Sequence, residues 1–167
     1  MIQMRFVTDV MLGRLSRWLR LLGFDTTSGL REDLRLLQTA ATEERTLLTR
    51  DRALFEQAER MGISCIYISS SQLKDQIVEL FERLGTSSID LDPAKSRCPM
   101  CNGELKAVRR EDLPDQVPEK VLHYHSEFFV CTDCRKIYWM GRHWENIEEK
   151  INDANALLSK GSGPHGA

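Results

Sequence analysis

Two Cys-x-x-Cys pairs in the second half of the chain constrain its fold more than any other feature. The first pair is Cys98 and Cys101, and the second pair, Cys131 and Cys134, follows after 29 intervening residues. Two thiolates that are two residues apart can bind one ion from a tight turn, and two such turns supply the four ligands of a tetrahedral zinc site. Because four sulfur ligands leave no open position, we expect a structural Zn²⁺ in a small four-cysteine zinc ribbon.

The alternatives to a zinc site are a pair of disulfides or a redox-active dithiol. Paired Cys-x-x-Cys units in a cytosolic protein favour metal binding, and nothing in the sequence indicates export. His123 and His125 lie between the two pairs, but four cysteines already fill the coordination shell. The fifth cysteine, Cys65, stands alone in an apolar run and is expected to be a small buried side chain.

The first half of the chain alternates between strand and helix patterns. Apolar or β-branched runs predict strands at residues 5–8, 24–27, 46–49 and 64–68, and helical spacing of apolar residues follows at 11–22, 33–41, 54–61 and 72–84. Short connections between such units are typical of a parallel sheet with helices on both faces. The predicted fold class is therefore α/β, with a parallel sheet flanked by helices and an appended zinc ribbon.

A change in composition suggests how the chain is divided. Residues 86–97 contain serine, aspartate and proline, which indicate a linker between an α/β domain at 1–85 and a ribbon at 98–158. The ribbon is expected to end with a helix over 144–158. The glycine-rich residues 159–167 are predicted to be a disordered tail.

No feature of the sequence predicts a membrane partner. No apolar run approaches the roughly 20 residues of a transmembrane helix, and residues 1–7 have the pattern of a strand rather than of a signal peptide. We therefore expect a cytoplasmic protein, and no motif identifies a protein partner. The net charge of −2 means that any site for a polyanion must be a local patch.

Three aspartates occupy positions that suggest a metal site in the α/β domain. Asp9 follows the first predicted strand, Asp51 follows the third, and Asp33 opens the second helix. Ligands of parallel sheets bind outside the carboxyl ends of the strands, and a hard cation such as Mg²⁺ would relieve the repulsion among three carboxylates there. The competing interpretation is that each aspartate caps the helix that follows it.

Basic and aromatic residues form two further groups. Arg14, Arg17 and Arg20 follow Asp9, and Arg50 and Arg52 flank Asp51, so these side chains could hold phosphates or simply balance the acidic groups. In the ribbon, basic residues alternate with aromatic ones, as on surfaces that stack single-stranded nucleic acid; the same aromatic residues could instead form its core. The candidates for contact with RNA in the ribbon are Arg135, Lys136, Trp139, Arg142 and Trp144.

Three separated motifs resemble one known family. Residues 6–23, 47–51 and 98–144, in this order, are similar to the signatures of the Mut-7 C-terminal ribonuclease family, and the similarity covers roughly residues 5–150. The resemblance implies a PIN-like nuclease domain with an appended zinc ribbon, and an activity that depends on Mg²⁺ or Mn²⁺. It implies that Asp9, Asp33 and Asp51 are the catalytic acidic residues. Arg135 stands where the ribbon of this family often carries glycine.

The sequence leaves three functions open. The first is a ribonuclease that cleaves single-stranded RNA at an aspartate-bound Mg²⁺ or Mn²⁺, with the ribbon aiding RNA or partner binding. The second is a catalytically inactive RNA- or ribosome-binding module. The third is a phosphoreceiver domain with Asp51 as acceptor, but this class needs a second acid where the chain has Val10, and a lysine after a fifth strand.

Overall fold

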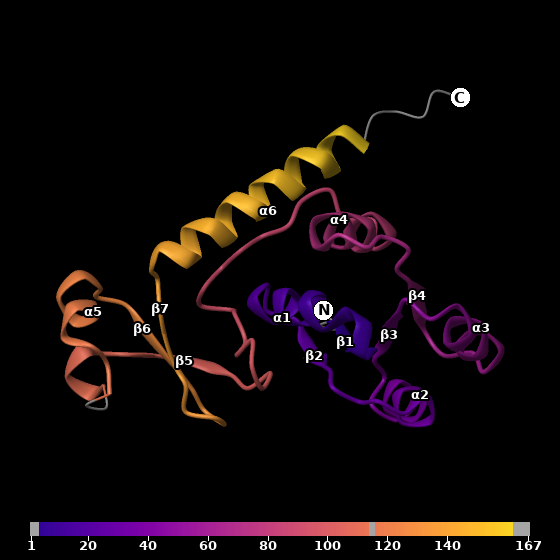
Figure 1. Cartoon of the computed structure of the whole chain (residues 1–167), viewed down its shortest axis with the longest axis horizontal. Helices are drawn as coiled ribbons and strands as arrows, with labels where there is room; N and C mark the ends of the chain where they lie inside the picture. The colour runs from indigo at the N-terminus through magenta and orange to yellow at the C-terminus, as the bar shows by residue number, and fades with distance from the viewer. Residues whose placement is uncertain (1–3, 114–115, 162–167) are drawn as a thin grey trace.

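A four-stranded parallel sheet forms the centre of the N-terminal part (Figure 1). A computed structural model describes residues 4–113 and 116–161. The strands are β1 (Arg5–Thr8), β2 (Asp25–Thr27), β3 (Thr46–Thr49) and β4 (Cys65–Tyr67). Their order is β2-β1-β3-β4, so the direction in which strands are added reverses between β1 and β3. The predicted parallel α/β sheet is confirmed.

Helices cover both faces of this sheet. They are η1 (Val10–Leu12), α1 (Gly13–Leu21), α2 (Asp33–Thr42), α3 (Arg52–Arg60), α4 (Leu73–Arg83) and the last helix, α6 (Arg142–Gly161). Successive residues of a strand point to opposite faces. Phe6 therefore packs with α1, α4 and α6, whereas Val7 packs with α2 and α3. The result is a three-layer arrangement with a core on each side of the sheet.

The cysteine-containing part forms a second, smaller sheet. Strands β5 (Leu105–Val108), β6 (Phe128–Cys131) and β7 (Ile137–Trp139) pair antiparallel in the order β5-β6-β7. The connection from β5 to β6 contains η2 (Arg110–Asp112) and α5 (Glu119–Tyr124). This sheet lies at one end of the molecule, and α6 runs from it back to α4 (Figure 1).

Helix α6 and the segment before the ribbon both pack on the α/β domain. Ile147, Ile151 and Leu158 of α6 lie in the same core as Phe6. The predicted linker is anchored to this helix, because Asn155 accepts a hydrogen bond from the amide of Ile89 at 2.7 Å and donates one to its carbonyl at 3.0 Å. The division into 1–85, 86–97 and 98–158 remains a prediction, and the last helix is longer than expected.

The predicted tail, 159–167, falls largely outside the described residues. Its first three residues, 159–161, form the last turn of α6, and 162–167 are not described. Within the described ranges, no helix combines the length and the hydropathy that a membrane crossing requires.

Gly23 allows the segment before the ribbon to approach the end of α1. Its φ of +90° is in the left-handed region, and a Cβ atom at this position would lie 2.9 Å from the carbonyl oxygen of Lys95. Next to it, the Ser96 hydroxyl donates to the carbonyl of Leu21 at 2.5 Å, and the Arg97 amide donates to the carbonyl of Arg20 at 2.8 Å. These contacts fix where the first cysteine pair begins relative to the parallel sheet.

Candidate metal centre and active site

The four cysteines converge on one point, as the sequence predicts. All four sulfur atoms lie within 4.8 Å of one another, with Cys98 Sγ 3.7 Å from Cys134 Sγ and Cys101 Sγ 3.4 Å from Cys131 Sγ. In a tetrahedral site with Zn–S bonds of about 2.3 Å, the sulfur atoms are about 3.8 Å apart. The observed spacing therefore fits zinc, and Cys98 and Cys131 are fully buried while their partners are exposed.

Two turns of the same shape present these cysteines. The amide of Asn102 donates to the carbonyl of Cys98 at 2.8 Å, and the amide of Arg135 donates to the carbonyl of Cys131 at 3.2 Å. Asn102 and Arg135 both have left-handed backbone conformations, with φ of 69° and 64°. Gly103 follows the first turn, where a Cβ atom would lie 2.8 Å from Cys131 Sγ. Only a residue without a side chain fits beside the metal ligands at this point.

Hydrogen bonds favour the thiolate form of Cys98. Burial alone would raise the pKa of Cys98, but hydrogen bonds from Tyr138 and from the amides of Cys101 and Met100 lower it to about 7. The Tyr138 hydroxyl lies 3.1 Å from Cys98 Sγ, and its own pKa is raised by burial and by this neighbour. Zinc binds thiolates rather than thiols, so this environment prepares Cys98 for the metal.

Replacing Arg135 with Gly is expected to stabilise the zinc-bound ribbon by about 0.5 kcal/mol. A left-handed backbone conformation costs a residue with a Cβ about 1–2 kcal/mol. Glycine avoids this strain, but it loses more conformational entropy on folding, which offsets part of the gain. Lys136→Gly is the matched control. Lys136 is the next residue and does not have a positive φ, so this variant should be less stable than wild type. Denaturant unfolding of the zinc-loaded protein measures both, and a destabilised Arg135→Gly variant would contradict the account.

Asp9 lies at the carboxyl end of β1 and is almost fully buried. Its Oδ1 accepts hydrogen bonds from the amides of Met11 at 2.8 Å and Leu12 at 3.2 Å, which caps η1. Its Oδ2 accepts from the Thr49 hydroxyl at 2.6 Å and from the Arg50 amide at 2.8 Å. Asp9 therefore caps a helix and also holds the turn that follows β3.

Asp51 lies on that turn and is exposed. Its Oδ1 caps α3 by accepting from the amides of Ala53 at 2.8 Å and Leu54 at 3.1 Å. Its own amide donates to Thr49 Oγ1 at 2.9 Å, so Thr49 joins the segments that carry Asp9 and Asp51. The capping interpretation holds for Asp9 and Asp51, and both lie at the edge where β1 and β3 end, whereas the metal site remains a prediction.

Asp33 is less closely connected to the other two aspartates. It is the exposed first residue of α2, which follows β2, so it lies at the same carboxyl edge of the sheet. We compared the distances between potential metal-ligand atoms of Cys, His, Asp and Glu in the described ranges 4–113 and 116–161. Only the four cysteines there form a group of three or more with all ligand atoms within 4.8 Å of one another. The three aspartates are not brought together to that extent.

The arginines near this edge have different environments. Arg14 and Arg17 of α1 are exposed, and Arg50 is partly buried with Nη2 3.4 Å from the carbonyl oxygen of Ser69. Arg20, which the sequence also suggested as a phosphate ligand, is buried. Its Nε donates to the carbonyl of Thr26 at 2.9 Å and its Nη1 to that of Pro99 at 2.9 Å. Its role is therefore to join α1 to the first cysteine turn rather than to hold phosphate.

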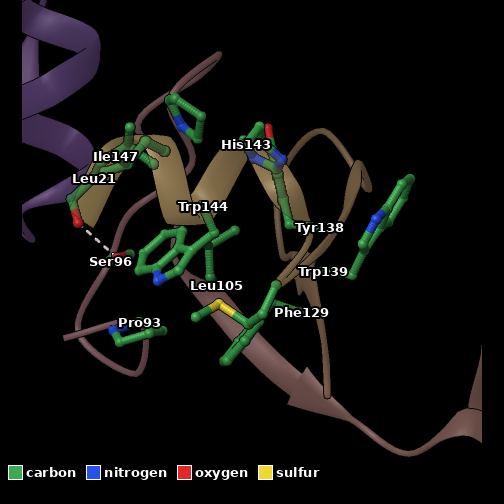
Figure 2. A pocket seen from close by; sticks show the side chains of 12 residues that line it. Leu21, Pro93, Ser96, Leu105, Phe129, Tyr138, Trp139, His143, Trp144 and Ile147 are labelled. Carbon is green, nitrogen blue, oxygen red and sulfur yellow. Dashed lines mark hydrogen bonds between the residues drawn. The ribbon is translucent and has the colours of Figure 1, made fainter. Parts of the chain in front are cut away.

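The aromatic residues of the ribbon also divide into two kinds. Trp144 is only 8% exposed, packs in the core with α1 and α4, and donates from Nε1 to Glu148 at 3.1 Å. This burial contradicts the prediction that it stacks on RNA, because so little of the residue is exposed to solvent. With Leu21 and Leu105 it lines an apolar cavity of about 140 Å³ where the ribbon meets the α/β domain (Figure 2). Trp139 is partly exposed, and Arg135, Lys136 and Arg142 are exposed.

Sequence reasoning missed a polar network that joins the two parts of the protein. Asp25 of β2 accepts hydrogen bonds from Arg45 Nη1 at 2.8 Å, from Asn102 Nδ2 at 2.7 Å and from Arg5 Nε at 3.1 Å. Asn102 Oδ1 in turn accepts from the Thr26 amide at 2.9 Å. The only signal in the sequence is an asparagine directly after the first cysteine pair. Its partners lie about 75 residues earlier in the chain, and local residue spacing cannot predict contacts over that separation.

The fold and these contacts define a parallel α/β domain fastened to a four-cysteine module that is suited to zinc. The model of the Mut7-C RNAse domain family matches residues 4–151, and the chain belongs to this family. No curated protein and no solved structure matches the chain. The family match confirms the resemblance of the three sequence motifs and leaves the phosphoreceiver interpretation without support.

Proposed function

We propose that the protein is a metal-dependent ribonuclease that hydrolyses phosphodiester bonds of RNA at the carboxyl edge of its parallel sheet. The observation that carries the proposal is the placement of Asp9 and Asp51. In a chain that belongs to an RNAse domain family, they follow neighbouring strands at the point where the strand order reverses. Ligands of open parallel sheets bind outside the strand ends at such a point.

The donor set at this edge suits a hard divalent cation in part. In the described part of the chain, Oδ2 of Asp51 accepts no hydrogen bond, and the side chain is exposed, as is that of Asp33. Asp9 already accepts four hydrogen bonds, which fill the lone-pair sites of a carboxylate. Asp9 must therefore lose one of its hydrogen bonds before it can bind a metal. Asp51 and Asp33 can bind a metal without such a loss.

The proposed catalytic metal is Mg²⁺ or Mn²⁺, held by Asp9, Asp33 and Asp51. Bound there, such an ion supplies a Lewis acid for the phosphoryl oxygen and an activated water. Arg14, Arg17 and Arg50 would pair with phosphates of the RNA backbone. The proposed contribution of the ribbon is to bind RNA or a partner through Arg135, Lys136, Trp139 and Arg142. The proposed cytoplasmic location fits thiolates that bind metal rather than form disulfides.

Replacing Asp51 with Asn should reduce RNA cleavage by at least about 100-fold, because the anionic ligand is lost. Asparagine is as good a helix N-cap as aspartate, so α3 should remain intact. Asp92→Asn is the matched control: Asp92 also accepts a hydrogen bond from a nearby amide, that of Ala94, but lies in the segment before the ribbon. The assay is cleavage of a labelled single-stranded RNA with Mg²⁺ or Mn²⁺ by zinc-loaded protein. Full RNA cleavage by Asp51→Asn would show that the proposed active site is wrong.

The saturated hydrogen bonding of Asp9 favours a second candidate function, a catalytically inactive RNA-binding module. A carboxylate that serves only to cap η1 and hold the β3–α3 turn needs no metal. This candidate requires that the wild-type chain binds RNA and does not cleave it with either metal. Chelators are unsuitable for this comparison, because they also remove the structural zinc.

A further inference from the structure

A cavity lined by basic residues lies between α1, α4 and α6, away from the cysteine cluster. It has a volume of about 260 Å³, and its lining includes Arg14 and Trp18 of α1, Lys74 of α4, and Lys150 and Asp153 of α6. Helix α6 therefore contributes to a surface that is otherwise built by α1 and α4. Neither the cysteine site nor the aspartates at the strand ends account for it.

The topology places this cavity beside the candidate active site. Helix α1 follows Asp9 through η1, and α4 follows the carboxyl end of β4, so both helices begin at the same edge of the sheet. Arg14 and Lys74 are each the second residue of their helix. The cavity thus begins within the first turns of the helices that leave the edge where Asp9 and Asp51 lie.

The charges of the cavity favour an anionic ligand. The charged side chains that line the cavity are three cations and one carboxylate: Arg14, Lys74, Lys150 and Asp153. In the part of the chain that the structure describes, neither Arg14 nor Lys74 takes part in an ion pair. Because the whole chain has a net charge of −2, a group of unpaired cations is a local feature of this surface.

Trp18 adds an aromatic surface to these charges. The Nζ atom of Lys150 lies 5.8 Å from the centroid of the Trp18 ring. An exposed cation–π contact of this kind is weak. A nucleobase can therefore displace the ammonium group from the ring and leave it free to pair with a phosphate. Stacking on an aromatic ring combined with nearby cations is how proteins bind single strands without sequence preference.

We propose that this cavity binds single-stranded RNA and leads the strand to the aspartates at the sheet edge. One base stacks on Trp18, and the adjoining phosphates pair with Arg14, Lys74 and Lys150. A duplex fits this surface less well, because its bases are already stacked on one another and cannot reach the ring. The inference rests on the proposed function for its substrate, but it concerns binding and can be tested without cleavage.

The test uses a fluorescein-labelled 12-nucleotide oligouridylate and the zinc-loaded full chain, with no added Mg²⁺ or Mn²⁺. Anisotropy gives the dissociation constant over a series of KCl concentrations. The double variant Lys74→Ala/Lys150→Ala should bind about tenfold more weakly. It should also lower the slope of log K against log [KCl] by about 1.4, since each phosphate contact contributes about 0.7 for single strands. Lys95→Ala/Lys160→Ala, at two exposed lysines outside both the cavity and the ribbon, is the matched control and should change neither value.

Variants of Trp18 test the stacking contact separately. Trp18→Leu keeps an apolar side chain against the core but removes the aromatic face, and it should weaken binding about tenfold, whereas Trp18→Phe should restore most of the affinity. The thermal midpoint of each variant shows whether it is folded. If Trp18→Leu does not fold, the lysine pair decides the question, because both lysines are exposed.

An unchanged dissociation constant and salt slope in the lysine double variant would overturn the inference, and so would equal affinity for an RNA duplex of the same length. A chain that binds no RNA but binds an acidic peptide at these lysines would also overturn it. The proposed function fails in a different way: weakened binding in the variants, together with no cleavage by wild type, would leave the RNA site in place and remove the nuclease.

Discussion

Replacing Cys131 with Ser is expected to abolish zinc binding and to unfold β5, β6 and β7. Cys131 is fully buried, ends β6, and lies 3.4 Å from Cys101 Sγ. The three-stranded sheet buries few large apolar side chains, of which Phe128 and Val130 are the main ones. Zinc sites of this kind supply about 10–16 kcal/mol of folding free energy, which so small a core cannot replace.

Hydrogen exchange and metal analysis measure this effect. Amides of β5–β7 should lose their protection in Cys131→Ser, whereas those of β1 and β3 should keep it, because their core is formed by α1, α4 and α6. Cys65→Ser is the control, since Cys65 lies in β4 and is not part of the cysteine cluster. A Cys131→Ser variant that retains a full equivalent of zinc would contradict the proposed ligand set.

Replacing Arg45 with Ala should lower the free energy of unfolding by about 2–3 kcal/mol, because Asp25 loses its main charged hydrogen-bond donor. The Arg45 side chain is only 6% exposed. It donates to both carboxylate oxygens of Asp25, at 2.8 and 3.2 Å, and to Glu43 at 2.7 Å. Without the guanidinium, Asp25 would remain partly buried and, among the described residues, would keep Arg5 and Asn102 as side-chain partners.

The pH dependence of stability should identify Asp25 as the affected partner. Burial alone would raise the pKa of Asp25, but hydrogen bonds from Arg45 and Asn102 hold it well below its usual value of 3.8. A carboxyl group whose pKa is lowered by folding stabilises the protein above its unfolded pKa, and this contribution is lost as the pH falls towards the folded pKa. The difference between wild type and Arg45→Ala should therefore shrink below about pH 4.

Denaturant unfolding from pH 3 to pH 7 tests both parts of this prediction. The double variant Asp25→Asn/Arg45→Met removes both charges, and it should be more stable than Arg45→Ala because no partly buried carboxylate remains without its main partner. A loss below 1 kcal/mol for Arg45→Ala, or a loss that does not change with pH, would mean that the network is not coupled as its hydrogen bonds indicate.

The alternating pattern of the first half was sufficient to predict the parallel sheet. The strands expected at 5–8 and 46–49 have the observed boundaries, because buried strands between helices are short apolar runs bounded by turns. The cysteine spacing also predicted that the four sulfur atoms come together, since one ion requires all four at one point. Both are local patterns whose physical consequence does not depend on the rest of the fold.

Tertiary packing explains what the sequence could not show. Arg20 has the same residue type as Arg14 and Arg17, yet it is buried because the first cysteine turn lies over it and offers carbonyl oxygens. Trp144 lies in a segment of alternating basic and aromatic residues, but α6 packs on the α/β domain and buries the ring. Neither residue could be assigned without knowing which surfaces meet.

The position of a divalent cation would show whether the aspartates at the sheet edge form a metal site. The measurement is the anomalous scattering of Mn²⁺ in crystals of the zinc-loaded protein soaked with the metal and a short RNA. We expect a Mn²⁺ peak about 2.1 Å from carboxylate oxygens of Asp51 and Asp9, the distance of a directly bound cation of this size. Zinc at the four cysteines without any Mn²⁺ peak at the ends of β1 and β3 would contradict this expectation.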